Sequence, residues 1–110
     1  MGNARQSWPT SGTDAYSYAK GTPNTFMRCA AVEYARHGIR VNALKADMLE
    51  GPRAGRWRRS GIPDGLLQEI PLGKATEPSE FVKMIVWLAT VAVSITGSTI
   101  DGDNGGHLRR

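Results

Sequence analysis

Apolar residues recur at helical spacing over residues 15–37, which predicts an amphipathic helix there. Its inward face takes four residues at the i, i+3, i+4, i+7 positions: Met27, Ala30, Ala31 and Tyr34. Thr13 or Asp14 suits the N-cap, and Gly38 is a stop signal. Pro23 lies one turn inside, where it removes a backbone hydrogen bond. The sequence therefore predicts a long helix with a kink just after Lys20.

Apolar and polar residues alternate over residues 39–44, which predicts a short strand directly after that helix. Glycine and proline break any period over residues 45–65, and a short helical piece is expected near 64–70. A second helix begins at about Thr76 and is apolar on most of its surface, so it should be largely buried. A last strand is expected at 98–100.

The predicted order is helix, strand, loop, helix, strand, which is an α/β pattern. Parallel sheets are normally several strands wide and covered on both faces. Two strands are too few, so the chain is expected to form one end of a larger doubly wound parallel sheet. The glycines at 102, 105 and 106 should end the last strand, and the tail from His107 onward should be loose.

Composition narrows the class of protein. The chain has 110 residues, enough for one modest domain, and a net charge of +4 that comes mostly from arginine. Its single cysteine, Cys29, favours a reducing compartment. The first residues lack the apolar run of a secretory signal, and the longest apolar run, 84–89, is too short to span a bilayer. A cytoplasmic protein with no membrane contact is expected.

Tyr16 and Lys20 form the pattern with the clearest chemistry. Residues four apart lie on one helix face, about one turn from each other. An ordinary tyrosine has a pKa near about 10, and a nearby ammonium favours the phenolate, so Tyr16 could exchange a proton with a substrate oxygen. Chance alone supplies this spacing in roughly one chain of this length in five. A surface tyrosine beside a solvated lysine is therefore the alternative interpretation.

Four segments in order resemble the C-terminal half of the short-chain dehydrogenase/reductase family. The first is Tyr-Ser-Tyr-Ala-Lys at residues 16–20. The second, at 33–43, is similar to the family's passage from helix to strand. The third, Ile-Pro-Leu-Gly-Lys-Ala-Thr-Glu-Pro at 70–78, resembles the entry into its next-to-last element, and the fourth, at 95–100, resembles its closing strand.

The resemblance implies a single incomplete Rossmann-type domain over residues 1–110 and an NAD(P)-linked oxidoreductase that interconverts an alcohol and a carbonyl. It implies that Tyr16 is the acid/base. Lys20 would hold the nicotinamide ribose and lower the pKa of Tyr16, and the backbone of Leu49 would meet the nicotinamide carboxamide. NAD and NADP are not distinguished, because the residue that separates them belongs to the family's N-terminal half.

Several residues depart from the family pattern. No Gly-rich phosphate loop follows a strand in this chain. The place of the family's catalytic serine falls near Asn3 and Ala4, and residues 46–47 and Gly51 replace its Pro-Gly pair and nearby threonine. The chain alone is therefore expected to be inactive. The alternative is a truncated, non-catalytic remnant that at most pairs with another subunit or a second copy through the 15–37 helix.

Two other signals are weaker. Four arginines surround Trp57 within residues 53–59, and such a run can bind phosphate or nucleic acid, although a solvated substrate loop is favoured. The two histidines, His37 and His107, show no metal-ligand spacing with Cys29, so no zinc site is expected. Cys29 is interpreted as a small packing residue.

Overall fold

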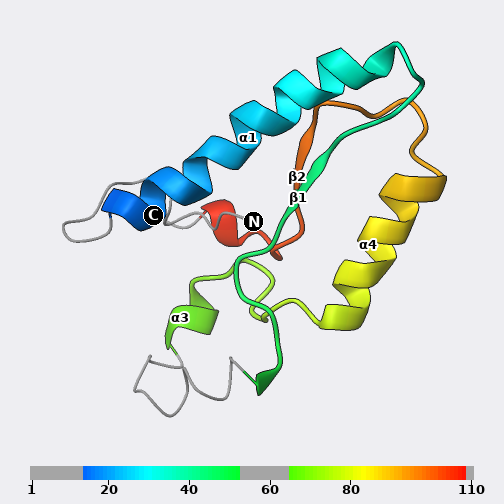
Figure 1. Ribbon diagram of the computed structural model, residues 1–110. Helices are drawn as coiled ribbons and strands as arrows, with labels where there is room; N and C mark the ends of the chain where they lie inside the picture. Colours follow the sequence, from blue (N-terminus) through cyan, green and yellow to red (C-terminus); the bar gives the residue numbers. More distant parts are fainter. Residues whose placement is uncertain (1–13, 53–64, 109–110) are drawn as a thin grey trace.

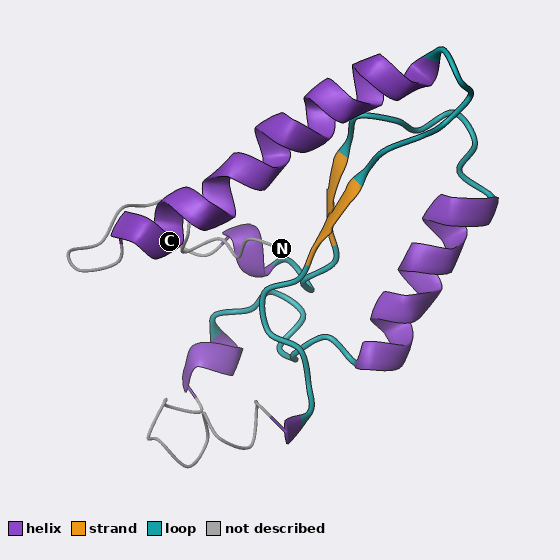
Figure 2. Cartoon of the chain, viewed as in Figure 1, coloured by secondary structure: helices purple, strands orange, loops and turns teal. Residues whose placement is uncertain are grey.

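The structure is a computed structural model that describes residues 14–52 and 65–108, with side chains from Pro23 onward within these ranges. Figures 1 and 2 show how the helices and strands are arranged in space. The elements are, in chain order, α1 (Asp14–Ala35), β1 (Ala43–Lys45), α3 (Gly65–Gln68), α4 (Pro78–Thr90), β2 (Thr99–Asp101) and the 3-10 helix η2 (Gly106–Leu108).

The two strands form a parallel sheet, which confirms the predicted α/β class. Ala43 pairs with Thr99, and the register runs on to Lys45 and Asp101. The strands run between α1 and α4 in Figure 1. The expected strand at 39–44 is found at 43–45, because the residues before Ala43 bond to the loop preceding β2. In that loop Gly97 N donates to Val41 O at 2.8 Å.

Helix α1 matches the predicted helix closely. Met27, Ala30 and Ala31 are buried as expected, whereas Tyr34 is 45% exposed and lies outside the core. A methyl group added at Gly97 would lie 3.5 Å from the Ala31 side chain, so α1 packs against the loop before β2. The helix continues through Pro23 without interruption.

Gly38 ends the first helix as predicted. Its φ of +71° is left-handed, a conformation that favours glycine. The Gly38 N–H donates to Ala35 O at 2.9 Å, and Ile39 N donates to Tyr34 O at 3.3 Å. These bonds satisfy carbonyls that the helix end would leave without partners, and they turn the chain toward β1.

Helix α4 is less buried than its sequence predicts. Pro78 stands in the first turn, where a missing N–H costs nothing. Phe81 and Leu88 are buried, but Val82 and Val86 are both 54% exposed. The expectation of a largely buried helix is wrong for the described residues, because a two-stranded sheet covers only one stripe of α4. The Cα radius of gyration, 15.6 Å, also exceeds the about 13 Å of a compact domain this long.

Arg40, three residues before β1, joins that segment to the end of α4. Its Nη1 donates to Leu88 O at 2.7 Å, to Ala92 O at 3.0 Å and to Ile95 O at 3.3 Å. Its Nη2 donates to Ala89 O at 2.9 Å. A guanidinium is suited to this place, because its fixed fork of donors meets several carbonyls at the negative end of a helix.

Asn42 adds a second link to the same loop. Its Nδ2 donates to Ile95 O at 2.8 Å, and its Oδ1 accepts from Ser98 N at 3.1 Å. The amide side chain thus bonds the loop before β2 on two sides, and Ala43 N continues the contact by donating to Ser98 O at 2.9 Å. These bonds set the register in which β1 and β2 pair.

We expect Arg40→Met to lower the free energy of unfolding by about 2 kcal/mol, because it leaves the α4 carbonyls without their charged donor. Urea unfolding followed by circular dichroism measures the change. Arg28→Met is the matched control, since Arg28 is exposed on α1; it should change stability by less than about 0.5 kcal/mol. Equal effects of the two substitutions would contradict this role for Arg40.

Candidate active site

Tyr16 and Lys20 lie within the first two turns of α1, which begins at Asp14. Their backbone positions are four residues apart on a continuous helix, so they share one face about a turn apart. The helical placement of the pair is as the sequence predicts. Their side chains lie outside the described part of the structure, so the acid/base role of the pair stays a prediction.

Leu49 follows β1 and forms an isolated parallel bridge with Thr76. In this bridge Thr76 N donates to Met48 O at 2.8 Å, and Glu50 N donates to Thr76 O at 3.0 Å. The bridge therefore uses the residues on either side of Leu49. Because backbone groups alternate in direction along an extended chain, the N–H and C=O of Leu49 point away from Thr76. Within the described residues neither group has a hydrogen-bond partner.

The residues that replace the family's Pro-Gly pair lie between β1 and Leu49. Ala46 is buried, and the Asp47 carboxylate lies against Gly106 at the start of η2. A methyl group at Gly106 would come within 2.7 Å of Asp47 Oδ2, so this close approach requires glycine. The segment after β1 is therefore in contact with the segment after β2.

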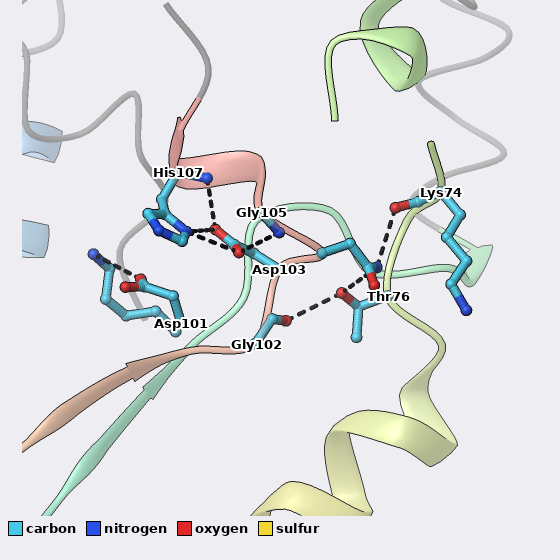
Figure 3. Close-up of polar contacts among 9 residues, drawn as sticks. Lys74, Thr76, Asp101, Gly102, Asp103, Gly105 and His107 are labelled. Atoms are coloured by element: carbon cyan, nitrogen blue, oxygen red, sulfur yellow. Dashed lines mark hydrogen bonds and ion pairs between the residues drawn. The ribbon is translucent and has the colours of Figure 1, made fainter. Parts of the chain in front are cut away.

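Asp103 organises the loop that joins β2 to η2 (Figure 3). It is only 5% exposed, and its carboxylate accepts hydrogen bonds from Gly105 N at 3.0 Å and from His107 N at 2.8 Å. The His107 Nδ1 lies 3.1 Å from Asp103 Oδ1. A buried carboxylate needs such partners. The expectation of a loose tail is therefore wrong for His107 and Leu108, which lie in η2 beside Asp103.

Asn104 and Thr76 tie this loop to the segment before α4. Asn104 has a φ of +56°, which asparagine tolerates better than most residues. Its Nδ2 donates to Lys74 O and to Thr76 Oγ1, both at 3.1 Å. Thr76 Oγ1 in turn donates to Gly102 O at 3.1 Å. The buried Thr76 thus contacts the loop through its side chain and Leu49's neighbours through its backbone.

Sequence reasoning missed a group of side chains at the end of β2. Asp101, Asp103 and His107 have potential ligand atoms within 4.8 Å of one another. The available signal was the short spacing between these two acids and His107 in the sequence. In this structure Asp101 pairs with Lys45 at 3.3 Å, and Asp103 pairs with His107, so each member has a partner among the described residues.

Other candidate residues lie apart from this region or outside the described residues. Cys29 is exposed on α1, so its interpretation as a packing residue is wrong. His37 follows α1 and accepts from Arg36 Nε at 3.2 Å if its Nε2 is unprotonated. The arginine run at 53–59 and the place of the catalytic serine near Asn3 lie outside the described residues.

Comparison with known proteins identifies the family. The family model described as enoyl-(acyl carrier protein) reductase matches residues 2–107. The chain belongs to the short-chain dehydrogenase/reductase family. The predicted resemblance is confirmed, and so are an oxidoreductase family and a Rossmann-type fold.

Similar curated proteins include a tropinone reductase homolog of Arabidopsis thaliana, 38% identical over 92 residues. The match covers 82% of this chain and 35% of that protein. A 2,5-dichloro-2,5-cyclohexadiene-1,4-diol dehydrogenase of Sphingobium indicum is 37% identical over 93 residues, which cover 82% of this chain and 37% of that enzyme. The chain thus spans about a third of the length of these relatives.

Solved structures agree on the fold. A short-chain type dehydrogenase/reductase from Mycobacterium ulcerans superposes with a TM-score of 0.84 at 24% identity, covering 98% of this chain and 40% of that one. An NADPH-bound short chain oxidoreductase from Pseudomonas aeruginosa, which contains an atypical catalytic center, gives a TM-score of 0.76 at 28% identity. The superposition covers 94% of this chain and 42% of that one.

None of the described helices is both long and apolar enough to cross a membrane.

We expect Asp103→Ala to release η2 from the loop, because it removes the acceptor for two backbone N–H groups. Hydrogen exchange at the amides of Gly105 and His107 should accelerate, and stability should fall by about 2 kcal/mol. His107→Ala is the matched control. It removes only a side chain that is 39% exposed, so both amides should stay protected. Equal acceleration in the two variants would show that the imidazole, rather than the buried carboxylate, holds the segment.

Proposed function

We propose that this chain is the C-terminal, acid/base-bearing part of an NAD(P)-dependent oxidoreductase that interconverts an alcohol and a carbonyl. One observation carries the proposal. The family match runs from residue 2 to residue 107, and within it Tyr16 and Lys20 fall one turn apart at the start of α1. The NADPH bound to the Pseudomonas aeruginosa relative supports a nicotinamide cofactor. A cytoplasmic location is inferred from the single cysteine.

The proposed chemistry of the chain's own residues is proton transfer. Tyr16 Oη gives its proton to the carbonyl oxygen in reduction and takes the hydroxyl proton in oxidation. The Lys20 ammonium, one turn along the helix, favours the phenolate and so lowers the pKa of Tyr16. The nicotinamide, when bound, supplies the hydride. The proposed substrate is a small alcohol or carbonyl compound.

Leu49 fits the cofactor's carboxamide. A carboxamide carries one hydrogen-bond donor group and one acceptor, and Leu49 offers an N–H and a C=O that point the same way. Neither group bonds to the described residues, and the bridge to Thr76 holds both in an extended segment. The donor set is therefore complementary to the group it would bind. Tyr16, Lys20 and Leu49 together make up the proposed cofactor contacts of this chain.

The chain offers the proposed nicotinamide contacts without a site for the cofactor's pyrophosphate. The sequence of residues 1–110 contains no G-x-G-x-x-G run, the fingerprint that holds a pyrophosphate in Rossmann-type proteins. We therefore infer that these residues alone hold cofactor weakly and do not turn over substrate. Supply of the nucleotide-binding half should create activity. The competing function is a non-catalytic partner subunit, which the exposed apolar residues of α1, such as Phe26 and Val32, favour.

The first test joins this chain to the nucleotide-binding half of the Sphingobium indicum relative and measures NADPH oxidation against a panel of carbonyl compounds. We expect turnover that Tyr16→Phe lowers by at least about a hundredfold, because general acid catalysis is lost. Tyr18→Phe is the matched control. Tyr18 is two residues away and faces another side of the helix, so this variant should keep its activity.

A Tyr16→Phe fusion as active as its parent would refute the acid/base role. A folded fusion that binds NADPH but reduces none of the carbonyl compounds would instead favour the non-catalytic partner. The unfused chain serves as the baseline and should show no NADPH-dependent turnover.

The second test addresses Leu49 in the same fusion. Leu49→Pro removes a backbone N–H that the bridge to Thr76 does not use, so the fold should persist. The loss of one hydrogen bond should weaken NADPH binding about 3- to 10-fold. Leu49→Val keeps the N–H and should bind NADPH like the parent. Binding is measured by NADPH fluorescence, and undiminished affinity in the proline variant would exclude this contact.

A further inference from the structure

A cavity of about 530 Å³ opens beside the loop that follows β2. The segment before α4, the first turns of α4 and residues 101–105 form its walls. Cavities of 300–1,000 Å³ are the size that small-molecule ligands occupy. The residues assigned to proton transfer and to the nicotinamide do not line this cavity. It is therefore a separate feature of the chain.

The walls divide into an apolar part and an acidic part. Pro71, Leu72 and Met84 supply the apolar surface, while Glu80, Asp101 and Asp103 supply carboxylates. None of the lining residues is a lysine, arginine or histidine. The carboxylates offer acceptors to a positively charged group, and the apolar wall favours an apolar body next to it.

Two of these carboxylates already bind ammonium groups from outside the walls. Lys74 Nζ lies 3.4 Å from Glu80 Oε1, with both side chains about half exposed. Lys45 Nζ lies 3.3 Å from Asp101 Oδ1. A surface pair such as that of Lys74 with Glu80 contributes about 0–1 kcal/mol, so an incoming ammonium can displace Lys74 at little cost. The pairing of Lys74 with Glu80 is the more exposed and hence the easier to exchange.

Asp103 contributes a fixed negative charge rather than a contact that must be exchanged. Its oxygens are committed to Gly105 N, His107 N and the His107 ring, and it is buried. The hydrogen bonds hold the carboxylate in one position, and its charge adds to the potential at the wall. Coulomb attraction near a protein surface acts over several ångströms, so direct contact with a ligand is not required.

We propose that this cavity binds a small organic cation, a primary ammonium on a compact apolar body. The ammonium takes the place of Lys74 Nζ at Glu80, with Asp101 and Asp103 adding attraction. The apolar body rests on Leu72 and Met84. Binding here is independent of the proposed hydride transfer, and the site fits a ligand that is recognised by charge and shape without being chemically changed.

The test uses the 110-residue chain labelled with ¹⁵N and a titration with benzylammonium chloride at pH 7 and low salt. Benzyl alcohol is the neutral match in size and shape. We expect saturable shifts of the Leu72, Gly102 and Asn104 amides, with benzyl alcohol binding at least fivefold more weakly. Equal binding of the two compounds, or no shift of these amides, would overturn the proposal. Displacement of the amine by equimolar Mg²⁺ would point to a metal site instead and would also overturn it.

Substitutions at the exchangeable pair give a second readout. Glu80→Gln should weaken benzylammonium binding at least threefold, and Glu69→Gln, at an exposed glutamate outside the cavity, should leave it unchanged. Lys74→Met removes the internal competitor and should tighten binding about threefold. Both paired residues are partly exposed, and the same spectra verify the fold of each variant. Unchanged affinity in Glu80→Gln, or weaker binding in Lys74→Met, would contradict the mechanism of exchange.

Discussion

The guanidinium of Arg40 is the contact on which the rest of the arrangement depends. A helix leaves its last carbonyls without backbone partners, and the end of α4 would expose several to solvent. Arg40 donates to four carbonyls between Leu88 and Ile95, so one side chain closes the helix and holds the following loop. The parallel sheet has only three residue pairs and few ladder bonds of its own. Its register is therefore set as much by Arg40 and Asn42 as by the strands.

The small size of the sheet leaves many hydrophobic residues exposed. A sheet of two strands can cover only one stripe of each helix, and large apolar side chains remain exposed on both. Phe26 and Val32 are about three quarters exposed or more on α1, and Val82, Val86 and Trp87 are about half exposed on α4. Exposed apolar surface of this extent marks places where further polypeptide packs. The match to about a third of each relative agrees with this, because those proteins are longer than the matched stretch.

Local features of the sequence predicted the helices and strands well. They did not predict the contacts between residues far apart in the sequence. The spacing from Met27 to Ala31 and the stop at Gly38 depend on neighbouring residues alone, so α1 was predicted almost to its ends. The burial of α4 depends on how many strands lie beneath it, which its own apolar pattern does not state. The placement of Tyr16 and Lys20 came from spacing, whereas the role of Leu49 came only from the family resemblance. The hydrogen bonds between Asp103 and His107 were not predicted, because they form across a turn in which Asn104 has a left-handed φ.

The proposed proton-transfer pair and the proposed carboxamide contact come from different elements, so their relative position must be fixed by packing. A short series of contacts connects α1 to Leu49. Ala31 of α1 packs at Gly97, Gly97 N donates to Val41 O, and Val41 leads through β1 to Leu49. Thr76 then holds the segment around Leu49 from the other side. Because α1 is continuous from Ala31 back to Tyr16, a shift of this helix along the loop would move the pair away from Leu49. The small residues at 31 and 97 therefore matter for the proposed chemistry as well as for packing, because a larger side chain at either place would shift α1 against the loop before β2.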